Sequence, residues 1–296
     1  MALQIGSYPE DDPNVWHYTT GQGLIGIFQT GCIWASSILF LNDSAEIHHA
    51  FRLARRYVAS PNFDELQKVL VDLAVDRAGG RDSPFLPAEY VNVYVASFSS
   101  KGDDLNQWRG YASKHGYAIG FSWKLIRSLA AREGFSFEKV RYSDHDKYTL
   151  LKPIIDEYLE GCDSLTLSLA KIKSLKGRWP WPDEPELANL ADQFSSKLSE
   201  VAPLIKDAAF AEEEEWRLVA KNTSNKYQLN YRDTATGLIP YITMDLKNEE
   251  KLEVRMLVVG PSPRQWHGMD ASVMAADTFG VVCKAWSPST VPYRNW

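Results

Sequence analysis

The sequence predicts an α+β fold in a single domain, with a helical insertion between two sheet-forming regions. Strand-like segments occur near the start of the chain, in the middle and throughout the last third, whereas residues 144–210 follow a mostly helical pattern. Strands resume directly after this stretch, and no repeat or low-complexity linker separates the regions. Residues 1–296 are therefore predicted to form one domain, with the helices of 144–210 inserted into it.

The first third predicts the order strand, helix, strand, helix, helix. The stretch "VWHYT" favours a strand because it joins β-branched and aromatic residues. "TGQGLIGIFQT" has helical apolar spacing, with Gly31 placed just after the helix end, and "CIWAS" is the next strand. Asn42, Asp43 or Ser44 can cap a helix in "AEIHHAFRLARRYV", and "FDELQKVLVDLAVDRA" predicts another.

The middle of the chain changes from helical to strand period. "EYVNVYVASFSS" alternates and predicts a strand, and "LNQWRGYASKH" predicts a short helix capped by Asp103 or Asp104 and closed by Gly116. The strand "YAIGFSW", the helix "KLIRSLAARE" and the strand "FSFEKVRYS" follow. The prolines of "KGRWPWPDEPE" break the helical insertion. The last strands are "EEEEWRLVA", "TGLIPYITMDL", "KLEVRMLVVGP" and "GVVCKAWS".

Composition excludes several classes of protein. The net charge of −6 predicts no general attraction to phosphate backbones or acidic membranes, although a local basic groove stays open. The three cysteines lie far apart and form no CxxC pair, which favours a reducing compartment. No signal peptide and no apolar run of about 18 residues is found, so we expect a cytoplasmic protein without a membrane span.

Several common catalytic motifs are absent from the sequence. His48 and His49 are adjacent, so they cannot chelate one ion from a shared helix face, and no metal site is expected. There is no Walker loop, no GxGxxG and no GxSxG, which removes the usual anchors for nucleotide-binding and hydrolase folds. The candidate chemistry lies instead in polar groups at the ends of predicted strands.

Four such groups stand out. They are His17 with Tyr18 and Thr19, then Asn42 with Asp43 and Glu46, then Ser97, Ser99 and Ser100 followed by Trp108 and Tyr111, and finally Glu213 and Glu215 with Arg217.

The glutamate run "EEEEWR" is the most informative of these groups. In a strand, Glu213, Glu215 and Arg217 would share one face. Carboxylates crowded together repel each other, so at least one pKa is expected to rise. A carboxylate held by an arginine and aimed at a sugar hydroxyl can stabilise an oxocarbenium-like transition state, as in glycosyl transfer.

Each group also has a purely structural interpretation. A strand histidine between aromatic residues is often a hydrogen-bonded core residue, and Trp108 and Tyr111 are often core as well. Ser97 and its neighbours can be a polar strand end. The glutamate run can be a solvated helix N-terminus, where negative charge suits the helix dipole. No single group decides between structure and function.

The order of the motifs resembles a widespread bacterial family, domain of unknown function DUF2971. The motifs are "HYT", "GLIGIFQTGCIWASS", "FLND", "SFS", "QW", "GYAIGF", "EWR", "VVGP" and "VPYR", which together run from about Trp16 to Arg294. The family has no settled activity, so its name implies no function.

A more distant likeness connects "VWHYTT" with histidine-type ADP-ribosyltransferases, such as poly(ADP-ribose) polymerases and diphtheria-type toxins. It implies their fold, a split mixed or antiparallel β-sheet, and NAD as the substrate. His17 would correspond to the histidine on the adenine-side ribose, and the backbone of Tyr18 and Thr19 to the nicotinamide amide site. Tyr18, where polymerase-type enzymes usually have glycine, would serve as a lid or stacking residue.

The later motifs extend the likeness in the same order. Ser97 or Ser99 would brace the cleft, and Trp108 or Tyr111 would stack on nicotinamide. Glu213 or Glu215 would meet the nicotinamide-ribose 2′-hydroxyl; by analogy with ExE transferases we favour Glu215. Asn42 and Arg217 complete the expected NAD-binding set.

The resemblance thus implies an NAD-dependent ADP-ribosyltransferase or NAD glycohydrolase without a metal, with the character of a bacterial toxin or phage-defence effector. The acceptor would be protein, nucleic acid or water, and the oligomeric state is left open. Two alternatives stay open: a non-catalytic module of the same fold that binds a nucleotide or protein, and a metal-independent nuclease in which His17 and glutamates act as acid and base.

Overall fold

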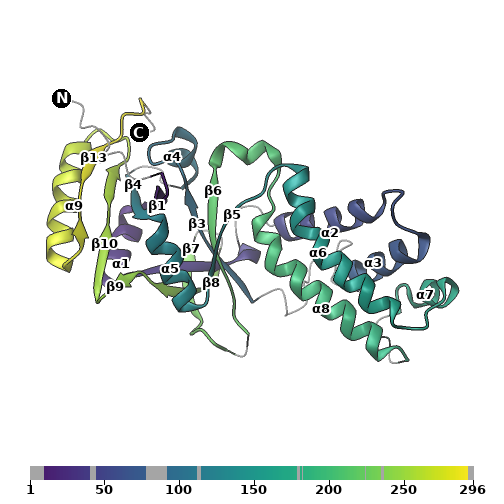
Figure 1. The fold of residues 1–296 in the computed structure, drawn as a ribbon. Helices are drawn as coiled ribbons and strands as arrows, with labels where there is room; N and C mark the ends of the chain where they lie inside the picture. Colours follow the sequence, from purple (N-terminus) through teal and green to yellow (C-terminus); the bar gives the residue numbers. More distant parts are fainter. Residues whose placement is uncertain are drawn as a thin grey trace.

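The chain folds into a β-sheet region and a helical region that lie side by side (Figure 1). The computed structural model describes residues 10–40, 45–77, 92–111, 115–178, 181, 183–223, 225–234 and 237–292. The large sheet is mostly antiparallel, with a parallel pair between β11 (Met256–Val259) and β13 (Trp286–Pro288). A mixed α+β architecture, as predicted, is confirmed.

Ten strands form the large sheet in the described part of the chain. The path along it runs β13, β11, β4, β1, β3, β2, β8, β7, and β6 and β5 extend from β3. The remaining bounds are β1 Asn14–Thr20, β2 Cys32–Ser37, β3 Val93–Ser99, β4 Gly116–Ser122, β5 Ser136–Lys139, β6 Glu215–Lys221, β7 Asn230–Thr234 and β8 Gly237–Asp245. A small second sheet contains β9 (Lys247–Asn248), β10 (Lys251–Val254) and β12 (Val282–Cys283).

The sheet splits at the middle of β3. One edge of β3 pairs with β6 over its whole length. Its other edge is shared, since β1 pairs with it at Ser99, opposite Trp16, and β2 pairs with it at Tyr94 and Val95. Residues 96–98 therefore have no strand partner on that edge among the described residues.

The helical region combines the predicted insertion with the two helices before β3. The buried cluster that joins them contains Phe51, Val71, Ile155 and Phe194, and it reaches the sheet at Val95. Figure 1 shows these helices gathered at one end of the molecule. They are α2 (Ala45–Val58), α3 (Glu65–Arg77), α6 (Asp144–Asp163), α7 (Leu169–Leu175) and α8 (Pro185–Val201).

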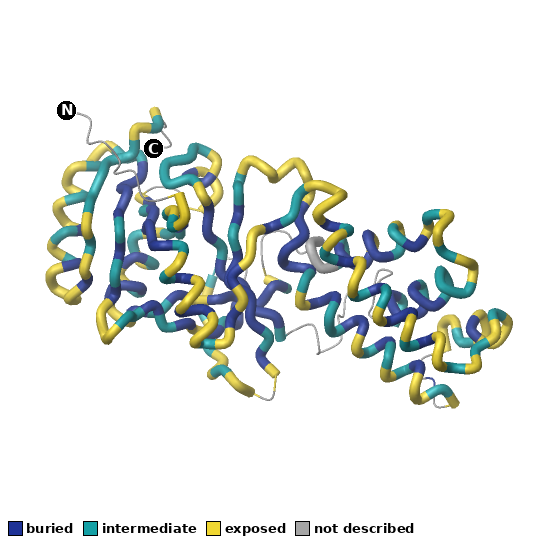
Figure 2. Tube along the Cα trace, in the orientation of Figure 1, coloured by how far each residue is buried: buried dark blue, intermediate teal, exposed yellow. Residues whose placement is uncertain are grey.

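Shorter helices cover the sheet and its ends. α1 (Gly21–Thr30) packs against α9 (Gln265–Phe279), and both contribute with α5 (Trp123–Glu133) to a second core, while α4 (Leu105–Tyr111) packs near β1. Three 3₁₀ turns are η1 (Ile38–Phe40), η2 (Ala202–Leu204) and η3 (Ala208–Glu213). Buried segments run through the central strands and along the inner helix faces (Figure 2).

The local predictions hold at some turns and fail at others. Gly31 adopts a left-handed conformation, with φ 69°, and ends α1 as predicted. Gly116 does not close a helix, because it is the first residue of β4. The strand β7 and the whole of α9 were not predicted, and "KLEVRMLVVGP" forms two short strands rather than one. No described helix is long and apolar enough to cross a membrane.

Candidate functional site

A buried network of two acids and two bases lies at the start of β6. Glu215 is 4% exposed and accepts from Arg217 twice, with Nε 2.8 Å from Oε1 and Nη2 3.0 Å from Oε2. Lys206 Nζ donates to Glu215 Oε2 over 3.2 Å and also pairs with Glu213. Arg217 Nη1 further donates to the backbone oxygen of Pro203 over 2.6 Å. The network therefore balances two negative charges with two positive ones.

These contacts fix the ionisation of the network. Burial would raise the pKa of Glu215, but the charges of Arg217 and Lys206 outweigh it and hold this pKa below its usual value. Burial alone would lower the pKa of Lys206, yet the carboxylates of Glu215 and Glu213 raise it instead. The rise expected for at least one glutamate pKa in this run does not occur at Glu215, because both cations reach its carboxylate.

Glu213 does not share a strand face with Glu215, contrary to the prediction. It is the last residue of η3, and Glu214 then turns through a left-handed conformation, with φ 44°, before β6 begins. Asp207 caps η3 by accepting from the Ala209 amide over 2.9 Å. The glutamate run is therefore the end of a 3₁₀ turn followed by a strand. It is not a helix N-terminus, which was its purely structural interpretation. Lys206 brings the two carboxylates together across the turn.

Two tyrosines adjoin this acid–base network. The Glu215 amide donates to the hydroxyl of Tyr142 over 3.0 Å, and burial followed by the nearby Glu215 charge raises the pKa of Tyr142 to about 12. Tyr111 at the end of α4 is 40% exposed, and the charges of Lys206 and Glu213 act on its hydroxyl. Tyr111 is therefore the predicted aromatic whose hydroxyl lies within electrostatic range of this network.

His17 meets the same strand segment at Ser97. Its Nδ1 lies 3.0 Å from the Ser97 backbone oxygen, and since a carbonyl oxygen only accepts, Nδ1 carries the proton. The ring packs against Phe98 with centroids 5.6 Å apart. Burial lowers the pKa of His17, and the positive charge of Arg232 lowers it further. The hydrogen bond to the Ser97 backbone opposes this shift but does not cancel it. The ring is therefore neutral at pH 7, with Nε2 as its acceptor atom.

Ser97 lies between His17 and Glu215. A side-chain hydrogen bond from Ser97 contributes to the low pKa of Glu215, while its backbone oxygen accepts from His17. The strand register pairs Trp16 with Ser99 and Ser99 with Glu215, so these three side chains share one face. His17, next to Trp16, belongs to the opposite face. His17 and Glu215 thus approach Ser97 from two sides of the sheet, and not as two walls of one cleft as expected.

Trp108 is a core residue, which corrects its prediction as a stacking platform. It is 1% exposed, and its Nε1 donates to Asp103 Oδ1 over 2.7 Å. Asp103 in turn accepts from the Thr290 amide over 2.7 Å, so this pair holds the C-terminal segment against α4. The two aromatic side chains of α4 thus lie in different environments: Trp108 is enclosed and Tyr111 is at the surface.

Tyr18 is also part of the core and cannot be a lid. It is 7% exposed, its ring meets the Trp108 ring edge-on at 4.7 Å, and its hydroxyl donates to the Lys101 backbone oxygen over 2.8 Å. The Asp104 amide donates to the same hydroxyl over 3.1 Å. Tyr18 therefore fixes the loop before α4, which explains an aromatic residue at this position.

The remaining predicted residues have structural roles or lie outside the described part of the chain. Ser99 is buried, donates to the Glu213 backbone oxygen over 2.8 Å and accepts from the Lys101 amide, so it braces the turn before β6. Thr19 lies against α1, where a Cβ on Gly23 would come within 2.0 Å of its hydroxyl oxygen. Asn42 lies outside the described residues. Lys206 and Tyr142 were not predicted, because neither belongs to a motif and only the fold brings them to Glu215.

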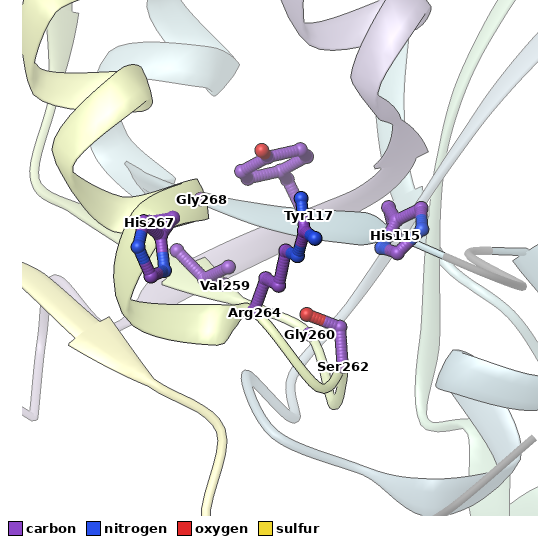
Figure 3. A pocket seen from close by; sticks show the side chains of 8 residues that line it. All are labelled: His115, Tyr117, Val259, Gly260, Ser262, Arg264, His267 and Gly268. Carbon is purple, nitrogen blue, oxygen red and sulfur yellow. The ribbon is translucent and has the colours of Figure 1, made fainter. Parts of the chain in front are cut away.

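A cavity of about 260 Å³ lies elsewhere, between the start of β4, the end of β11 and the start of α9. Figure 3 shows His115 and His267 on opposite sides of Arg264 there. The lining residues are His115, Tyr117, Val259, Gly260, Ser262, Arg264, His267 and Gly268. None of the predicted site residues lines it, so this cavity is separate from the Glu215 network.

Comparisons with known proteins support a family but no activity. The family model described as "Protein of unknown function (DUF2971)" matches residues 107–218, which confirms the expected family resemblance over that segment. The segment begins within α4 and ends within β6, so it contains Tyr111 and the whole Glu215 network but not His17. Neither the curated proteins nor the solved structures gave a match.

Proposed function

We propose that this protein is an ADP-ribosyltransferase-like enzyme that binds NAD at the split of the sheet and cleaves the nicotinamide–ribose bond. The observation that carries the proposal is that a strand histidine, His17 of β1, is followed later in the chain by Glu215 of β6, a carboxylate that Arg217 and Lys206 hold in place. Those two residue types, in that order along the chain, are the ones implied by the likeness to histidine-type transferases.

The chemistry of the proposed site follows from its charges. The cleaved bond leaves positive charge on the ribose, and an ionised carboxylate nearby stabilises that charge. Glu215 is kept ionised by Arg217 and Lys206. The exposed ring of Tyr111 would stack on nicotinamide. His17, on the opposite face of the sheet, would act indirectly by holding the Ser97 backbone in place.

The enclosure of Glu215 sets a condition on this mechanism. A ribose hydroxyl reaches the carboxylate only if one of its ion-pair contacts loosens when NAD binds, because Glu215 is 4% exposed. Lys206 is the contact more easily exchanged, since it donates one bond over 3.2 Å and has Glu213 as a second partner. Arg217 holds the carboxylate with two bonds and would keep it oriented.

The biological setting belongs to the same proposal. NAD would lie at the division of the sheet beside β3, where residues 96–98 lack a strand partner on one edge among the described residues. The ADP-ribose would pass to a protein, a nucleic acid or water, and a bacterial enzyme of this kind would act as a toxin or phage-defence effector in the cytoplasm.

A second candidate is a non-catalytic nucleotide- or protein-binding module of the same fold. The observation that favours it is the same network, because a glutamate satisfied by three bonds from two cations is also what a structural ion-pair cluster contains. The two candidates differ in whether bound NAD is cleaved.

Incubation of the purified full chain with NAD separates the candidates. The transferase proposal predicts nicotinamide release, reduced at least tenfold by Tyr111→Ala and by Glu215→Gln, while Glu212→Gln at an 83% exposed side chain leaves it unchanged. All reactions are run at a temperature where circular dichroism shows each variant folded. NAD binding without nicotinamide release supports the binding module instead, and absence of both contradicts the two candidates. RNA cleavage without NAD would indicate the nuclease.

A further inference from the structure

The sheet face that carries Glu215 continues across the split onto β2. Directly paired residues of neighbouring strands project from the same face. Val95 pairs with Val219 of β6 and with Ser36 of β2, and Val219 shares its face with Glu215 because they are four residues apart on one strand. Ser36 therefore lies on the Glu215 face, beyond the division of the sheet.

The same face extends to β8 and β7. Ser36 pairs with Tyr241, and Tyr241 pairs with Asn230, which is two residues from Arg232. Trp34 is two residues from Ser36 and projects with it. Trp34, Ser36, Tyr241 and Arg232 thus form one polar and aromatic group, which we call the β2–β7 face.

Arg232 is incompletely satisfied on this face. Its Nη2 donates to the Ser36 hydroxyl over 3.0 Å. Its Nε is buried and has no hydrogen-bond partner, and no ion pair joins this guanidinium to a carboxylate of the described residues. Ser36 itself is 6% exposed. The guanidinium is therefore held in place by Ser36, and its terminal Nη1 and Nη2 groups, rather than the enclosed Nε, are the donors that a ligand could reach.

An arginine in this state is unusual for a purely structural residue. Arg232 is partly buried with its Nε enclosed, and charges withdrawn from water in this way are normally paired, because an uncompensated one is costly to desolvate. Burial lowers the pKa of Arg232, with only the Tyr241 hydroxyl opposing it, which agrees with a poorly compensated cation. The planar guanidinium has the geometry to bind a phosphate with two parallel bonds.

An aromatic pair stands next to this cation. The Trp34 and Tyr241 rings stack with centroids 4.5 Å apart and an interplanar angle of 26°, and Trp34 is 38% exposed. Trp34 lies two residues along β2 from Ser36, a separation of about 7 Å. That spacing suits the distance between the phosphate and the base of one nucleotide, and aromatic rings are common platforms for bases.

We propose that the β2–β7 face is a nucleotide subsite in which Arg232 binds a phosphate and Trp34 contacts the base. The identity of the nucleotide as NAD, with its diphosphate on Arg232, rests on the proposed function. The binding of a phosphate-bearing nucleotide rests only on the contacts of this face. Ser36 of this face pairs with Val95, next to the residues of β3 that lack a strand partner on that edge, so the subsite adjoins the division of the sheet.

Calorimetric titration of the full chain with ADP, adenosine and NAD tests the subsite. We expect Arg232→Gln to weaken ADP and NAD binding by tenfold to a hundredfold, about the effect of losing a charge-assisted bond, and to change adenosine binding little. Trp34→Ala should weaken all three ligands. The matched control is Arg52→Gln, which removes the same charge from an exposed position on α2.

A stability measurement separates a ligand-binding arginine from a structural one. Because Arg232 is poorly compensated, Arg232→Met should unfold at the same or a higher urea concentration than the wild type, whereas loss of a structural arginine lowers it. ADP binding that depends on Arg232 supports the subsite even if NAD is not cleaved, in which case only the proposed function fails. Equal ADP affinity in Arg232→Gln, or no binding of ADP and NAD by the wild type, overturns the inference.

Discussion

Replacing Glu215 by glutamine should destabilise the protein severely while barely changing side-chain volume. The wild-type network has Glu213 and Glu215 against Lys206 and Arg217, two charges of each sign. In Glu215→Gln the two cations face one carboxylate, so a net positive charge is left in a region where Lys206 and Arg217 are 5% and 3% exposed. Removing one partner of a buried pair costs about 3–5 kcal/mol.

The hydrogen bonds of Glu215 lead to the same range. Three charge-assisted bonds are lost or weakened, from Arg217 Nε, Arg217 Nη2 and Lys206 Nζ. Each contributes about 1.5–3 kcal/mol, but bonds to one carboxylate are coupled and do not add. Since glutamine fills the same space, no cavity contributes, and about 3–5 kcal/mol stands as the expected loss in the free energy of unfolding.

Urea unfolding followed by tryptophan fluorescence measures this loss. Glu212→Gln, at an exposed side chain, is the control and should change stability by less than about 0.5 kcal/mol. Adding Lys206→Met to Glu215→Gln leaves Glu213 and Arg217, one charge of each sign. The double variant should therefore lose less free energy of unfolding than the sum of the losses in the two single variants. A loss below about 1 kcal/mol in Glu215→Gln would refute the buried network.

Three further predictions follow from single contacts. The depressed pKa of His17 means that the unfolded chain binds its proton first as pH falls below about 6.5, so stability should fall there by up to about 1.4 kcal/mol per pH unit. His17→Asn should remove that part of the pH dependence, and an unchanged profile would contradict the depressed pKa. Trp108→Phe should cost about 1–3 kcal/mol in urea unfolding by losing its buried bond, whereas Tyr111→Phe at the surface should cost under about 0.5 kcal/mol; equal losses would contradict the placement of the two rings. Gly260→Ala should cost about 1–3 kcal/mol, because its Cβ would lie 2.9 Å from a backbone oxygen and 3.0 Å from the Trp108 ring; Gly26→Ala, with open space around it, is the control that should lose nothing.

The glutamate run shows how far local sequence reasoning reaches. The strand after it was predictable, since "EWRLVA" alternates in the way that a half-buried strand does. Glu213 was misplaced because a left-handed residue at Glu214 breaks the strand period, and no local signal marks that turn. The partner Lys206 could not be inferred, because the isolated lysine has no motif and becomes a site residue only when η3 folds back.

The aromatic and positive residues show the same limit. Spacing places Trp108 and Tyr111 three residues apart on one helix, but it does not say which side of α4 faces β1. In the folded protein Trp108 packs with Trp16 and Tyr18 in a core cluster, which only the tertiary structure reveals. Arg232 lies on β7, which forms a hairpin with β8. A short strand at the edge of a sheet gives a weak sequence signal, so neither β7 nor the position of Arg232 could be predicted.

The most direct test of the central claim is nicotinamide release from NAD by the full chain, compared between the wild type and Tyr111→Ala. Tyr111 is 40% exposed, so this variant should stay folded and isolate chemistry from stability. The proposal predicts steady release by the wild type and at least a tenfold lower rate in Tyr111→Ala. Equal rates in the two proteins, or no release by a folded wild type, would contradict a transferase site beside Glu215.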